Sequence, residues 1–184
     1  MIMQSGFKGN VFSIELLKRI LFYGIATLVL GSLQCAFFPF LDFCPATPDL
    51  ILTMLVAIAL LDSPKSAAIC AVACGFFIDA IGGSGISLSP VIYFLTIVVI
   101  SFFTEKILRG LPAFLLLLIP ALLCRAVSTY ACVAIIERTL PSASVFSGII
   151  LPEAICTAIL AIPVYFLVKL CSIPLQSHGK FNFQ

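Results

Sequence analysis

Three ionisable side chains interrupt long apolar stretches of the sequence, namely Asp79, Arg125 and Glu153. Charged groups at membrane depth are costly and rare, so they face the interior of a helix bundle and pair with one another. An arginine side chain can also bend several ångströms toward the membrane surface. We therefore predict that Arg125 bridges to Asp79, to Glu153 or to both. The alternative that stays open is that the two acidic residues are interfacial and solvated.

Residues that would support catalysis are scarce in the apolar stretches. The single histidine, His178, lies in the polar C-terminal tail. The letters GGSG, Gly82 to Gly85, match the serine motif of rhomboid intramembrane proteases, but no apolar stretch supplies the histidine that such a serine needs. An intramembrane aspartyl protease needs two facing aspartates, and Asp79 has no such partner. No metal-ligand cluster or phosphate loop is found in the sequence. We expect a protein that is not an enzyme and needs no cofactor or metal.

Small residues recur at helical spacing before Asp79. Ala67, Ala71, Gly75 and Asp79 are each four residues apart, so they share one face of a helix. Small residues at this spacing let a second helix approach closely. We predict a packing seam that ends in Asp79 as a polar anchor. The alternative is that alanine and glycine are simply frequent in membrane helices.

A glycine-rich turn follows Asp79 at once. Gly82, Gly83 and Gly85 allow left-handed or strained backbone conformations. The next apolar stretch begins near Pro90. We predict that the chain turns tightly here on the outer side of a membrane.

The composition indicates that all of these residues belong to a membrane protein. Of the 184 residues, 62% are hydrophobic and 10% are charged, whereas soluble domains carry roughly 25% charged residues. Mean hydropathy is +1.25. Six apolar segments predict an all-α integral membrane protein, a single transmembrane domain of six helices with no soluble domain. The expected helices cover residues 20–40, 50–61, 66–81, 90–103, 112–136 and 145–168.

The second and third segments are short for membrane-spanning helices. At 1.5 Å per residue they reach roughly 18 and 24 Å, which is less than the hydrocarbon thickness of about 30 Å. They are either short spanning helices sheltered by longer neighbours or a re-entrant hairpin. Asp62 and Lys65 in their connection favour spanning. Pro120 is expected to break the fifth segment, and Pro163 lies inside the sixth.

Basic residues are distributed unevenly among the connections. With six crossings, eight lysines and arginines fall on one side of the membrane and Arg138 falls on the other. The positive-inside rule then places both termini in the cytoplasm. Asp42, Asp49 and Glu137 are expected on the outer side, and Pro48 and Asp49 are expected to open the second helix.

Most of the eight cysteines fall inside apolar segments, where cysteine behaves as a small hydrophobic residue. These are Cys70, Cys74, Cys124, Cys132 and Cys156. Cys35 and Cys44 flank the first outer loop, and a disulfide between them is a second possibility that the sequence leaves open.

The order of several short motifs resembles the MreD family, the rod-shape-determining membrane proteins of bacteria. The motifs are SLQCAFFPF, PDLIL, GFFIDAIGGSGIS with Gly75, Asp79 and Gly85, and LPEAICTAILAIPVYFL with Pro152 and Glu153. The resemblance extends over nearly the whole chain, from about Ile20 to Leu170. Arg125 and the many cysteines do not match the family's pattern.

The resemblance implies a non-enzymatic scaffold of the bacterial cytoplasmic membrane that binds MreC directly. Through MreC it would act with MreB, RodA and a class B penicillin-binding protein to direct peptidoglycan synthesis during elongation. We expect Asp79 and the turn after it to shape a groove for the transmembrane helix of MreC, or for its adjoining segment. No nucleic acid is expected as a partner, and self-association into a homodimer stays open.

The resemblance also implies a fold similar to the substrate-binding subunits of energy-coupling-factor vitamin transporters. Such a subunit is the alternative function, since it would also be a small six-helix protein without catalytic residues. These subunits are expected to carry an A-x-x-x-A motif in their first helix. Here that spacing occurs instead at Ala67 and Ala71 and at Ala154 and Ala158. The sequence also lacks tryptophan for a ligand pocket, so the scaffold is preferred.

Overall fold

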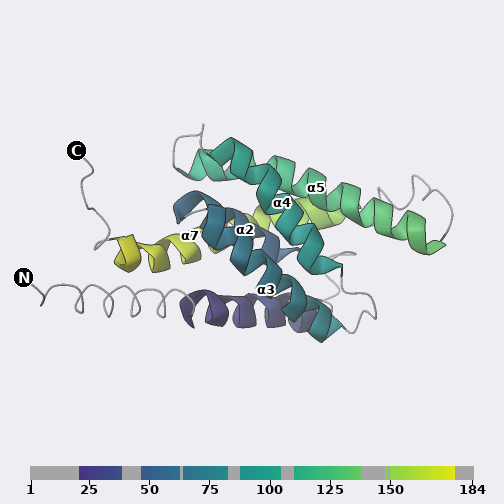
Figure 1. Ribbon diagram of the computed structural model, residues 1–184, viewed down its shortest axis with the longest axis horizontal. Coiled ribbons are helices and arrows are strands. Elements are labelled where there is room, and N and C mark those ends of the chain that lie inside the picture. The colour runs from purple at the N-terminus through teal and green to yellow at the C-terminus, as the bar shows by residue number, and fades with distance from the viewer. Residues whose placement is uncertain are drawn as a thin grey trace, which may run out of the picture.

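Helices form all of the regular structure that the computed structural model describes (Figure 1). The described residues are 21–38, 47–62, 64–82, 88–104, 110–137, 148 and 150–176. The first helix, Leu21–Phe37, ends in the π-helical turn η1, Leu33–Phe37. The others are α2 (Leu50–Leu61), α3 (Pro64–Gly82), α4 (Ser89–Thr104), α5 (Leu111–Glu137) and α7 (Leu151–Gln176).

Within the described residues, three helices are long and apolar enough to cross a membrane. Their apolar windows are Pro64–Ile81, Leu111–Cys132 and Leu151–Leu170. Three further apolar helices are shorter, and these are the first helix, α2 and α4. This all-helical, apolar architecture is that of a helical membrane protein.

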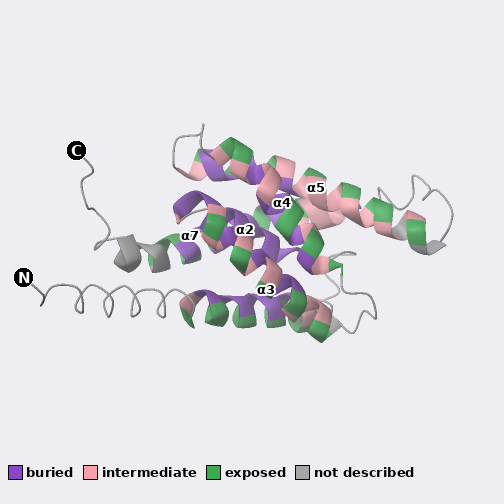
Figure 2. Ribbon diagram, viewed as in Figure 1, coloured by how far each residue is buried: buried purple, intermediate pink, exposed green. Residues whose placement is uncertain are grey.

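Helix α2 lies at the centre of the described bundle (Figure 1). It packs against α3, α4, α5 and α7, and all twelve of its residues are buried (Figure 2). Its sequence, LILTMLVAIALL, is apolar on every side, which is typical of a helix enclosed by others. The short second segment is thus a helix sheltered by its neighbours. The longer helices present their outer faces to the surroundings, as the exposed Ile69, Ile135 and Leu170 show.

Expectation and structure differ at Pro120 of α5 and at the ends of α7. We expected Pro120 to break the fifth segment, but α5 continues through it. Neighbouring helices and local adjustments can satisfy the backbone groups that a proline frees in a membrane helix. Helix α7 begins at Leu151 and continues to Gln176, whereas we expected residues 145–168. Apolar composition marks where a stretch meets lipid, and a helical backbone can continue past that point. Residues 145–147 lie outside the described residues.

Candidate functional site

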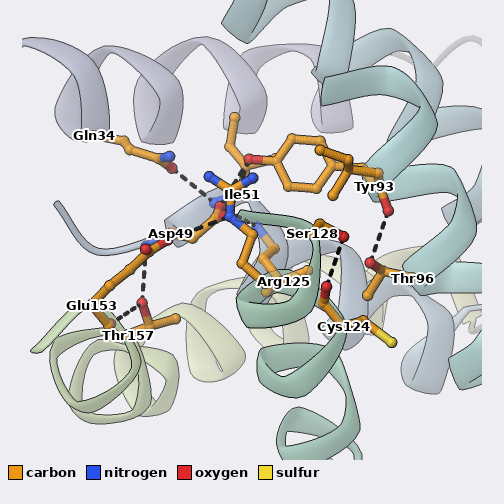
Figure 3. Close-up of polar contacts among 12 residues, drawn as sticks. Gln34, Asp49, Ile51, Tyr93, Thr96, Cys124, Arg125, Ser128, Glu153 and Thr157 are labelled. Atoms are coloured by element: carbon orange, nitrogen blue, oxygen red, sulfur yellow. Dashed lines mark hydrogen bonds and ion pairs between the residues drawn. The ribbon is translucent and has the colours of Figure 1, made fainter. Parts of the chain in front are cut away.

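Asp49 is the centre of a buried polar cluster at the start of α2 (Figure 3). Its side chain is only 1% exposed. As the N-cap of α2, its Oδ1 accepts a hydrogen bond from the backbone N–H of Leu52 at 3.0 Å. The hydroxyl of Tyr93, from α4, lies 3.1 Å from each carboxylate oxygen and donates to them. Asp49 therefore joins α2 to α4.

Arg125 links this carboxylate to a second one. Its Nε lies 3.2 Å from Oδ2 of Asp49 and 3.4 Å from Oε1 of Glu153. The guanidinium also lies 5.8 Å from the centre of the Tyr93 ring, within the range of a cation–π interaction. One cation from α5 thus bridges α2 and α7 in a region where an isolated charge would be strongly unfavourable.

Side chains from other helices satisfy the buried N-terminus of α2. The first N–H groups of a helix have no partner inside it, and a buried helix start must find partners elsewhere. Oε1 of Gln34, from the first helix, accepts from the N–H of Ile51 at 3.3 Å. The hydroxyl of Thr157, on α7, accepts from the N–H of Asp49 at 3.0 Å. The same hydroxyl donates to the backbone carbonyl of Glu153 at 2.6 Å. Five helices therefore meet at this point (Figure 3).

The predicted ion pair between Arg125 and Glu153 is confirmed. The Glu153 side chain is 15% exposed, so it is a partly buried partner that contacts Arg125 and not a fully solvated interfacial residue. Asp79 is not part of this cluster. Among the ion pairs of the described residues, Arg125 joins Asp49 and Glu153 and not Asp79.

Sequence reasoning missed Asp49, which we expected among the outer charges. It does open α2, as predicted. The length of α2 is the signal that could have shown that Asp49 is buried. The twelve residues of α2 separate Asp49 from Asp62 at the other end, which is about 20 Å from one aspartate to the other. A helix that leaves one membrane surface and stops after that distance begins inside a hydrocarbon layer of about 30 Å.

The predicted small-residue seam is present between α3 and α4. Ala67 and Ala71 are fully buried. A Cβ atom at Gly75 would lie 2.3 Å from Cα and 2.4 Å from N of Pro90, so the two backbones touch at this point. Oδ2 of Asp79 accepts a hydrogen bond from the N–H of Ser89 at 3.2 Å, where α4 begins. Asp79 therefore anchors the start of α4, as the prediction of a polar anchor required.

The remaining predicted residues are placed as follows. Gly82 is the last residue of α3, while Gly83 and Gly85, and with them the predicted tight turn, lie outside the described residues. Pro152 is the second residue of α7, and Glu153 lies in its first turn.

The cysteines differ from expectation in two respects. Cys35 is a free thiol, so the suggested disulfide with Cys44 is wrong; Cys44 itself lies outside the described residues. Cys156 is disulfide-bonded and not simply a small hydrophobic residue. Cys156 lies in the second turn of α7, close to the start of the helix at Leu151, and not in the middle of the segment. Free thiols are found at Cys70, Cys74, Cys124 and Cys132, as expected.

A crevice of about 10 Å³ lies beside the cluster, between α5 and α7. Its lining residues are Leu122, Arg125, Ala126, Ile150, Glu153 and Ala154. This volume is close to the space that one water molecule needs. The described residues contain no group of three histidine, cysteine or acidic side chains that could hold a metal ion. The cluster is thus built to hold helices together by charge, with its acidic groups already engaged by Arg125 and Tyr93.

No family model, curated protein or solved structure matches this chain. Its function is therefore inferred from the residues and from the resemblance of their order to a known family.

Proposed function

We propose that this protein is a non-enzymatic membrane scaffold of the bacterial rod complex. In this proposal it binds MreC and helps to direct peptidoglycan synthesis and cell shape. MreB, RodA and a class B penicillin-binding protein act with it through the complex. The order of motifs in the sequence, from PDLIL to LPEAICTAILAIPVYFL, supports this family assignment.

The main support for the proposal is that the ionisable groups inside the bundle bind other groups of the chain and join its helices. Asp49, Arg125 and Glu153 engage one another across α2, α5 and α7. Asp79 is engaged at the start of α4. Charged residues inside membrane proteins often mark ion or substrate pathways, but here they fix the relative positions of helices. A bundle whose helices are held together by such contacts suits a protein that must present a fixed surface to a partner.

The alternative of a vitamin-binding subunit has less support. Ligand sites for small molecules usually occupy about 300–1,000 Å³ and combine apolar walls with a few polar groups. A groove of about 530 Å³ between the first helix and α3 is large enough, but its walls are mainly apolar. The crevice beside the buried cluster, where polar groups gather, has only about 10 Å³. A vitamin could enter there only if α5 and α7 separated and the ion pair with Glu153 broke.

We also propose that six helices cross the cytoplasmic membrane, with both termini in the cytoplasm. The excess of lysine and arginine on one side supports this orientation. The disulfide at Cys156 adds support, because Cys156 lies in the half of α7 that is nearer the proposed outer surface. Disulfides persist in oxidising compartments and are rare in the cytosol.

Replacement of the chromosomal gene in the source bacterium tests the function. Cells depleted of the protein should widen and lose the ordered pattern of new wall synthesis, which pulse labelling with a fluorescent D-amino acid measures. Wild-type protein should restore both properties. Asp79→Asn, which keeps an oxygen acceptor for Ser89, should restore them better than Asp79→Ala. Normal width and labelling in depleted cells would contradict the proposal.

A further inference from the structure

Helix α5 is packed very differently along its two halves (Figure 2). Its first half has a regular buried face, which consists of Ala113, Phe114, Leu117, Leu118 and Ala121. Beyond Ala121, no α5 side chain that the structure describes is buried. We call residues 122–137 the outer arm, which is about 24 Å long. Segments with few buried contacts are the ones that open most easily in a folded protein.

Pro120 lies next to Ala121, where the buried face of α5 ends. A proline has no N–H group, so the helix loses one backbone hydrogen bond to the carbonyl four residues earlier. The proline ring also crowds that carbonyl, and sharp bends in helices are found mostly at such residues. The weakest point in the backbone of α5 therefore coincides with the point where its packing changes.

Arg125 joins the outer arm to other helices close to Pro120. Its Nε lies 3.2 Å from Oδ2 of Asp49 on α2 and 3.4 Å from Oε1 of Glu153 on α7. Ser128, almost one turn further along, donates to the carbonyl of Cys124 within the same helix at 2.7 Å. The ion pairs of Arg125 therefore connect to the bundle a part of α5 that has no buried apolar face.

The surroundings of the outer arm give it little close packing. Residues 151–156 of α7, which include the partner Glu153, also have no buried side chain. Lipid tails are as apolar as leucine, so contact with lipid does not hold a helix in one position. The first half of α5 is different, because its buried face is enclosed by other helices.

We propose that the outer arm turns about Pro120 and that Arg125 is the latch that holds it in the observed position. With both ion pairs intact, the arm is fixed against α2 and α7. When they break, the arm moves away from α7. The crevice of about 10 Å³ between Arg125 and Glu153 then widens and admits water to Asp49. This inference concerns α5 alone and does not depend on the proposed function.

Distances between pairs of spin labels, measured by pulsed electron paramagnetic resonance in lipid nanodiscs, test the hinge. Nitroxides are attached through p-acetylphenylalanine, which leaves the native cysteines unlabelled. One pair joins Ile135 on the arm to Ile69 on α3, and the control pair joins Leu116 on the first half of α5 to Ile69. All three positions are exposed. A tilt of about 20° at Pro120 would move the far end of the arm by about 8 Å.

The wild type should give one narrow distance for each pair. Arg125→Met should add a second distance, shifted by about 8 Å, to the arm pair and leave the control pair narrow. Adding Pro120→Ala should reduce that second population about tenfold or more, because alanine restores the N–H group and stiffens the helix. Glu153→Gln is a milder variant that leaves Asp49 as a partner for Arg125, and it should give a smaller second population.

Three results would overturn the inference. The first is an arm pair that keeps one narrow distance in Glu153→Gln and in any Arg125→Met protein that folds. The second is equal broadening of both pairs, since the whole bundle and not the arm would then have loosened. The third is a second population that Pro120→Ala leaves unchanged, because the bend would then lie elsewhere in α5.

Discussion

Replacing Arg125 with methionine should strongly destabilise the bundle. The change removes the cation that lies 3.2 Å from Asp49 and 3.4 Å from Glu153. Asp49 is buried and Glu153 is partly buried, at 1% and 15% exposed, so Asp49 in particular cannot turn to water. Breaking a buried ion pair by removing one partner costs about 3–5 kcal/mol. This is a large part of the 5–15 kcal/mol by which a typical domain is stable. Methionine retains an unbranched apolar stem, so little of the effect comes from lost packing.

A short series separates the charge effect from other causes. Glu153→Gln should cost less than Arg125→Met, because Arg125 keeps Asp49 as its partner. The double variant should be more stable than the sum of the single effects indicates, because it leaves one orphaned carboxylate and not two. Lys65→Met, at an exposed lysine near the start of α3, is the control for loss of a positive charge.

Thermal unfolding in mild detergent, followed by fluorescence-detected gel filtration, measures these differences. Arg125→Met should lose its monodisperse peak at a much lower temperature than wild type, while Lys65→Met should not. Wild-type stability of Arg125→Met would refute the view that this cation pins α2, α5 and α7 together. Strict additivity in the double variant would show that Arg125 and Glu153 act independently.

Three further predictions follow from single contacts. Gly75→Ala should lower the unfolding temperature, since its Cβ would need about 1 Å more room against the α4 backbone. Such overpacking costs about 1–3 kcal/mol. Gly24→Ala should instead raise the free energy of unfolding by up to about 1 kcal/mol. Tyr93→Phe should cost about 1.5–3 kcal/mol in the same assay, because it removes a donor to the buried charge of Asp49. Cys156 should react with a maleimide only after reduction of the denatured protein, and mass spectrometry of the labelled peptide checks this.

The helices and the seam could be predicted because their signals are periodic and local. Ala67, Ala71, Gly75 and Asp79 lie on one face by spacing alone. The structure buries Ala67 and Ala71 and places Gly75 and Asp79 against the start of α4. The pairing of Arg125 with an acid follows from the cost of a lone charge in lipid. It required only that an acidic residue be within reach.

The depth of a residue inside the bundle, and its pairing with residues far away in the sequence, could not be predicted in the same way. Asp49 sits at the edge of an apolar run, which in sequence looks like a loop position, yet it is 1% exposed. Only the contacts that the first helix, α4, α5 and α7 make with the start of α2 show that it is enclosed. The disulfide at Cys156 requires a second cysteine, which the sequence around Cys156 does not identify. The continuity of α5 through Pro120 depends on neighbouring helices and local adjustments. The residues next to each of these features in the sequence do not predict them.

Co-purification of the tagged full chain from native membranes, with mass spectrometry of its partners, tests the central claim most directly. The scaffold proposal predicts that MreC and wall-synthesis proteins are recovered in mild detergent, and that recovery falls with Asp79→Ala. Recovery of paired ATPases with a transmembrane coupling subunit, or of a bound vitamin, would contradict it and indicate a transporter subunit.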